Sequence, residues 1–180
     1  MTYYSGPDLA RSFRVVRNHT VQIAQEIPDE HYGFRVTAET RTVAELLAHI
    51  AAQSGYHHRL HGVDKLSEFT FEAWGRYQQD VTAFERSLAA KDDIVGALER
   101  QGDAFASWLE TLTDTALGEI VTFPPPLQPS TKTRFEMLLG AKEHEMHHRA
   151  QLMVMQRLIG LVPHLTRARQ QRSAATTAAR

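Results

Sequence analysis

One long amphipathic helix, predicted over residues 134–159, most constrains how this chain can fold. A capping box at Thr133–Glu136 marks its start, and Gly160 and Pro163 end it. Apolar residues recur at helical spacing along it: Met137, Ala141, Leu152, Met155 and Ile159. Because a stripe of this length has to pack against other helices, the stretch predicts an element of a helical core.

Two histidines lie within that apolar stripe. His144 and His148 are about 40° apart around the helix, since each residue advances it by about 100°. Burying a polar side chain without a partner costs roughly 1–3 kcal/mol, so two adjacent imidazoles there need an explanation. Metal ligation is the leading interpretation, because an i, i+4 pair can direct two nitrogens to one ion at about 2 Å. The alternative is that each is an ordinary core histidine or lies on a partly solvated flank.

A third ligand has to come from another segment, because two histidines alone hold a metal weakly. His49 is favoured, since it lies in the middle of a second predicted helix beside Leu46 and Gln53. A competing i, i+4 pair, His57 and His61, lies near the end of the same helix. Three histidines from two helices would leave coordination positions open for water or substrate.

Three further residues are candidate catalytic groups around these histidines. Glu145 and His147 flank the stripe on the C-terminal helix, and Tyr56 projects from the His49 side of the second helix. Each could orient a ligand or transfer a proton at such a site.

The segment His144–His148 also matches the HExxH pattern of zinc metalloproteases. No Asp or Glu follows Glu145, and Gln151 and Val154 stand where the longer pattern needs Gly and His. The chain also has no clear sheet to align a peptide substrate by strand addition. A metallopeptidase is therefore only a remote alternative.

The remaining sequence predicts three more helices, which start near Pro7, at the capping box Thr42–Glu45 and near Asp92. Residues 63–91 show only a weak pattern and are interpreted as a long connection with room for one short helix. Residues 116–123 could form a short extended piece. Four main helices without a convincing sheet predict an all-α four-helix bundle, with the long connection between helices 2 and 3.

Length and composition restrict the class of protein. We expect one domain over residues 1–165 and a flexible, basic tail over residues 166–180. A net charge of −1 favours neither nucleic acid nor an anionic membrane as a partner. With ten histidines and no cysteine, only histidine and carboxylate ligands are plausible for a metal. The absence of a signal-peptide pattern and of an apolar run near ~20 residues predicts a cytoplasmic protein.

Two blocks of the sequence resemble the DinB/YfiT-like metalloenzymes. The first is Thr42–Ile50, which ends in Leu-Ala-His-Ile, and the second is His144–Leu152, which contains His-x3-His-Arg-Ala-Gln and is followed by Arg157–Gly160 and Pro163. The similarity covers roughly residues 8–163, and the combination of both blocks is more specific than either alone.

The resemblance implies a bundle that binds a divalent metal, often nickel or zinc, through His49, His144 and His148. It also implies homodimers and chemistry that depends on a low-molecular-weight thiol. We therefore expect a metal-dependent enzyme, a thiol-dependent S-transferase or a hydrolase type, that acts on a small molecule. The alternative is a non-catalytic bundle in which the metal joins helices or binds a ligand as a sensor.

Overall fold

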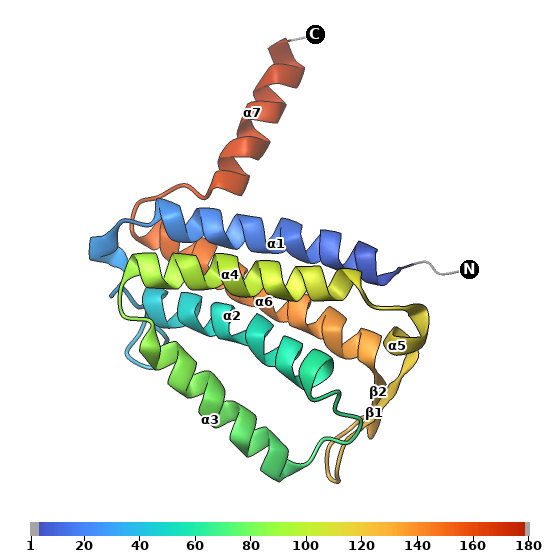
Figure 1. Ribbon diagram of the computed structural model, residues 1–180. Coiled ribbons are helices and arrows are strands. Elements are labelled where there is room, and N and C mark those ends of the chain that lie inside the picture. Colours follow the sequence, from blue (N-terminus) through green and yellow to red (C-terminus); the bar gives the residue numbers. More distant parts are fainter. Residues whose placement is uncertain (1–3, 179–180) are drawn as a thin grey trace.

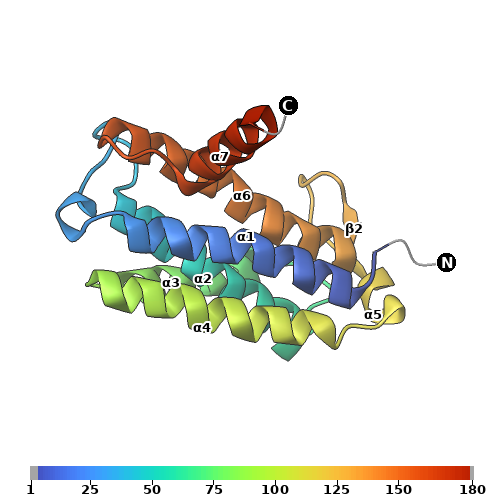
Figure 2. The same ribbon diagram turned by 90° about the horizontal axis from the view of Figure 1, so that it is seen from above.

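Four long helices lie side by side in the computed structural model, which describes residues 4–178 (Figures 1 and 2). They are α1 (Gly6–Glu26), α2 (Val43–His58), α4 (Lys91–Glu110) and α6 (Arg134–Leu158). α1 packs against α4 and α6, and α2 packs against the same two helices from the opposite side of the bundle. The predicted all-α four-helix bundle is confirmed.

Shorter elements connect and flank these helices. They are the 3₁₀ turn η1 (Asp29–His31), the π-helical turn η2 (Arg59–Val63), α3 (Phe71–Ser87), α5 (Asp114–Gly118), β1 (Ile120–Thr122), β2 (Thr131–Thr133) and α7 (His164–Ala178). β1 and β2 pair antiparallel, with Val121 opposite Lys132. The extended piece predicted over residues 116–123 is therefore divided between the end of α5 and β1.

The connection between helices 2 and 3 differs from the prediction, because it contains a helix of 17 residues, α3. Figure 1 shows that the neighbours α2 and α4 run in the same direction, so the chain must travel back along the bundle between them. A helix of that length spans about 25 Å, which suits this return. α3 buries only Ala73, Tyr77 and Val81. So narrow a buried stripe leaves a weak apolar pattern in the sequence.

The C-terminal segment forms α7, which projects away from the bundle (Figure 1). Its side chains are exposed from residue 169 to residue 177, and residues 179–180 lie outside the described part of the chain. Residues 166–178 are thus helical, and their flexibility stays a prediction. None of the described helices combines the length and the apolar character that a membrane span requires.

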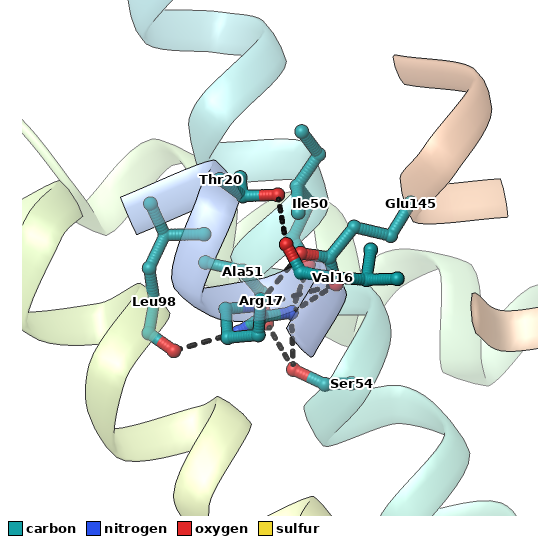
Figure 3. A network of polar contacts seen from close by, with 8 residues as sticks. All are labelled: Val16, Arg17, Thr20, Ile50, Ala51, Ser54, Leu98 and Glu145. Carbon is teal, nitrogen blue, oxygen red and sulfur yellow. Dashed lines mark hydrogen bonds and ion pairs between the residues drawn. The ribbon is translucent and has the colours of Figure 1, made fainter. Parts of the chain in front are cut away.

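A buried ion pair lies between two apolar parts of the core. Figure 3 shows its polar contacts. Arg17 on α1 donates from Nε to Glu145 Oε1 on α6 at 3.0 Å and from Nη2 to Oε2 at 2.8 Å. Its Nη1 donates to the Leu98 carbonyl on α4 at 2.6 Å, and Nη2 also reaches Ser54 Oγ on α2 at 3.3 Å. One guanidinium therefore joins all four helices, with both charged side chains no more than 5% exposed.

Gly102 on α4 provides the room for this arginine. A Cβ atom at that position would lie 2.8 Å from Arg17 Cγ and 3.0 Å from Nη1. Since the guanidinium is fixed by its hydrogen bonds, the stem has little freedom to move away.

We predict that Arg17→Met destabilises the bundle by about 3–5 kcal/mol, because it leaves the Glu145 carboxylate buried without a partner. The double variant Arg17→Met/Glu145→Leu should lose less unfolding free energy than Arg17→Met, since it removes both charges together. Urea unfolding followed by far-ultraviolet circular dichroism measures both. A double variant at least as unstable as Arg17→Met would contradict this account of the ion pair.

Candidate metal centre

Three imidazoles from two helices converge on one point at the interface between α2 and α6. The Nε2 atom of His144 lies 3.4 Å from Nε2 of His49 and 3.1 Å from Nε2 of His148. All three residues offer one ligand atom within 4.8 Å of the others, and they are the group of that kind found among residues 4–178. The structure therefore brings together the three residues predicted as metal ligands.

These distances fit a shared divalent ion. Two nitrogens bound to one zinc ion at 2.0–2.1 Å in a tetrahedral arrangement are about 3.3 Å apart. The separations of 3.1 and 3.4 Å lie close to that value. Three neutral nitrogen donors suit zinc, nickel and other late first-row ions, so the donor set fits a metal without selecting one.

The second nitrogens of two of these histidines are held by neighbouring side chains. His49 Nδ1 contacts Glu85 Oε1 on α3 at 2.7 Å, and His148 Nδ1 contacts Gln151 Oε1 at 2.9 Å. Both partners are acceptors, so each Nδ1 carries the proton and each Nε2 presents a lone pair. Two lone pairs aimed at the same point repel unless a cation or a proton lies between them. This arrangement is typical of metal-binding histidines.

Burial keeps these imidazoles neutral at physiological pH. It is the main cause that lowers the pKa of His144 to about 4, and the charge of His148 acts in the same direction. Burial also lowers the pKa of His49 and His148, against the opposing effect of their hydrogen bonds to Glu85 and Gln151. Since metal ligation needs unprotonated nitrogen, lowered pKa values favour binding at neutral pH.

A cavity of about 410 Å³ lies beside His148, the member of the histidine cluster that belongs to its lining. His148 and Gln151 form part of its wall, and the loop that precedes α2 forms another part, from Val36 to Arg41. A space of this size accommodates a small molecule. The cluster thus meets, through His148, a cavity that opens toward solvent.

Glu145 does not lie with the histidines. Its buried carboxylate points toward α1 and accepts hydrogen bonds from Arg17 on both oxygens (Figure 3). A general base has to reach the reacting groups, so this placement gives no support to a catalytic role for Glu145. It also removes the base that the HExxH pattern of metalloproteases requires.

The other two candidate catalytic residues occupy different surroundings. His147 is exposed next to the cluster, where its Nε2 contacts Gln151 Nε2 at 3.2 Å. Tyr56 packs its ring against Tyr77 and lines a separate cavity of about 260 Å³ between α2 and α3. Burial raises the pKa of Tyr56 to about 12, so its hydroxyl stays protonated. Of the two, His147 is the one with a ring contact to the three-histidine cluster, through His148.

The competing pair His57 and His61 forms no comparable centre. Their rings stack with centroids 5.8 Å apart, and His61 Nδ1 lies 2.9 Å from Nη1 of the buried Arg134. A guanidinium at that distance disfavours a bound cation. The pair is therefore part of the polar core between α2 and α6.

Glu85 is the functional residue that sequence reasoning missed. It lies on α3, within the segment interpreted as connection, and its side chain is only 20% exposed where it meets His49. Gln151 was within reach of prediction, because a residue three positions after His148 lies on the same side of a helix.

We predict that Glu85→Ala weakens zinc binding by about 10–100-fold, because the His49 ring loses the acceptor that fixes its orientation. Competition with a chromophoric chelator measures the affinity. Glu72→Ala is the matched control, since Glu72 lies on the same helix and pairs only with the exposed Arg76. Equal affinities for the two variants would contradict the role assigned to Glu85.

Acid should destabilise the metal-free protein before its carboxylates titrate. Burial lowers the pKa of His57 and His144 to about 4 and that of His61 to about 3. In the unfolded chain these groups bind protons below about pH 6.5, so the unfolded state takes up more protons as the pH falls toward 4. We expect the free energy of unfolding to drop by about 2 kcal/mol or more from pH 7 to pH 5.

Urea denaturation of chelator-treated protein at several pH values tests this dependence. His57→Phe removes one of the three groups and should flatten the profile. A flat profile in the wild-type protein between pH 7 and pH 5 would contradict the neutral state of these histidines.

Comparison with solved structures finds the same fold. YjoA, a DinB-like protein from Bacillus subtilis, has 20% identity and a TM-score of 0.63 over 84% of this chain and 91% of that protein. YfiT from Bacillus subtilis has 16% identity and a TM-score of 0.64 over 89% of this chain and 91% of its own. It is described as a probable metal-dependent hydrolase with an unusual four-helix bundle topology.

A mycothiol-dependent maleylpyruvate isomerase is also similar, at 14% identity and a TM-score of 0.62. The match covers 84% of this chain but only 63% of that protein. None of the curated proteins matches the sequence at a significant level. The family model of the DinB family matches residues 2–178, which is nearly the whole sequence. The chain therefore belongs to the DinB family.

Proposed function

We propose that this protein is a metal-dependent enzyme that acts on a small molecule, with His49, His144 and His148 as ligands of one divalent ion. Zinc and nickel are the ions we favour, and thiol-dependent S-transfer or hydrolysis is the chemistry we favour. The single observation that carries the proposal is the convergence of three histidines through their Nε2 atoms, one of which, His148, lines a cavity of about 410 Å³. A metal that only joined helices would normally have four protein ligands and no adjoining cavity.

The chain's own residues supply orientation. Glu85 holds the His49 ring and Gln151 holds the His148 ring, each through Nδ1. Gln151 also contacts His147, whose exposed ring lies next to that of His148, with centroids 5.0 Å apart. We assign His147 the transfer of a proton between solvent and a reacting group at the three histidines.

Three neutral imidazoles leave a bound divalent ion its full charge, so it would supply Lewis acidity toward a water or a small thiol. The chain has no cysteine, so the nucleophile must come from outside the protein. Two similar proteins support water and a small thiol as the candidate nucleophiles, since one is described as a probable metal-dependent hydrolase and another as mycothiol-dependent. A low-molecular-weight thiol is accordingly the co-substrate we propose.

Metal content and activity of purified, untagged protein test the proposal together. We expect about one divalent ion per chain, lost in His49→Ala, His144→Ala and His148→Ala but retained in His57→Ala. The loaded wild type should then transfer a small thiol to an electrophile, or hydrolyse an activated ester, at least about 100-fold faster than the chelated protein.

Two results would contradict this proposal. Absence of a stoichiometric metal after reloading would remove the metal centre. A full metal complement with no difference in activity between loaded and chelated protein would leave a non-catalytic binding bundle. Sedimentation of the same samples tests the homodimer that we propose from the family resemblance.

A further inference from the structure

The cavity beside His148 is lined by apolar side chains, by polar side chains that include the carboxylate of Glu39, and by a single cation. Val36 in the loop before α2 and Val154 on α6 are apolar residues of its lining, and they are 49% and 53% exposed. Arg41 lies in the same lining as His148. Ligand cavities are typically lined by apolar side chains with a small number of polar or charged groups that orient the ligand.

Arg41 has no protein partner for its charge within the described part of the chain. No hydrogen bond or ion pair of its side chain is found there, although its field lowers the pKa of Glu45. By contrast, Arg35 in the same loop lies 3.6 Å from Glu45 and donates to the Ala38 carbonyl at 3.3 Å.

The nearby carboxylates are already engaged. Glu45 accepts a hydrogen bond of 2.7 Å from the Thr42 backbone at the start of α2. Glu39, which also lines the cavity, has its pKa lowered by hydrogen bonds from Thr37 and from its own backbone. The guanidinium of Arg41 therefore remains available to a ligand.

The guanidinium is also close to the metal ligands. Arg41 and His148 line the same cavity, and the charge of Arg41 is the last-ranked of the causes that lower the pKa of His144 and of His148. A molecule bound to Arg41 in this cavity would therefore extend toward His148.

We propose that Arg41 binds a carboxylate of the substrate, so that the site selects small organic acids with a short apolar body. This inference rests on the proposed function, because it names the substrate class of the same site. A guanidinium binds a carboxylate through two parallel hydrogen bonds. The apolar body then lies between Val36 and Val154, with its far end toward His148. A phosphate ester fits less well, since the single cation in the lining cannot balance both of its charges.

Binding of hexanoate and of the neutral hexanamide tests the proposal, by methyl NMR of Val36 and Val154 in zinc-loaded and in metal-free protein. We expect hexanoate to shift both residues and to bind at least about tenfold more tightly than hexanamide. Arg41→Gln should lower the affinity for hexanoate by about tenfold or more, and Arg41→Lys should lower it less. Arg35→Gln is the matched control in the same loop and should bind as the wild type does.

Three outcomes would overturn the proposal: no hexanoate binding to the wild type, equal binding by Arg41→Gln, or equal binding of acid and amide. Measuring hexanoate binding to the metal-free protein distinguishes a failure of this proposal from a failure of the proposed function. If the protein holds no zinc, the enzyme proposal fails, while the effect of Arg41→Gln on hexanoate remains measurable. If zinc binds at full stoichiometry in every variant and Arg41→Gln changes nothing, only the role of Arg41 fails.

Discussion

The buried ion pair between Arg17 and Glu145 is the interaction on which the site depends. It fixes the rotation of α6, because Glu145 can meet α1 only if that side of the helix faces inward. The adjacent His144 and the next-turn His148 then face α2, where His49 meets them. A charged pair in a core contributes little net stability compared with apolar packing, but its geometry excludes other rotations of the helix.

The topology of the bundle supplies the rest of the site. Because α2 and α4 are parallel neighbours, the chain needs α3 to return between them, and the last turns of α3 bring Glu85 against His49 (Figure 1). The loop between α1 and α2 crosses one end of the bundle and brings Arg41 to the cavity. Two connections between bundle helices thus provide the residues around the proposed metal centre, whose three histidines lie on the bundle itself.

The sequence predicted which three histidines would come together better than it predicted their surroundings. His144 and His148 could be predicted because i, i+4 spacing is a local property of one helix. His49 could be predicted because it is a polar residue at the edge of an apolar helix face.

The sequence pattern placed Glu145 at the flank of the apolar stripe, because it centred that stripe on His144. The buried residues Leu138, Ala141, Glu145, His148 and Leu152 recur with alternating steps of three and four, so Glu145 lies on that stripe and His144 at its side. From the sequence, a charged residue that is buried cannot be told from one at the exposed edge of a helix unless its partner is known. The partner of Glu145 is Arg17, which lies 128 positions away in the sequence. The contact of Glu85 with His49 is likewise tertiary.

The central claim is that three imidazoles bind one divalent ion through Nε2. X-ray absorption spectroscopy of protein loaded with one equivalent of zinc tests it most directly, since the outer-shell scattering of imidazole rings reports how many are bound. The account predicts three imidazoles at about 2.0–2.1 Å together with at least one further light-atom ligand, and two imidazoles in His49→Ala. A wild-type spectrum with fewer than three imidazoles, or one unchanged by His49→Ala, would contradict it.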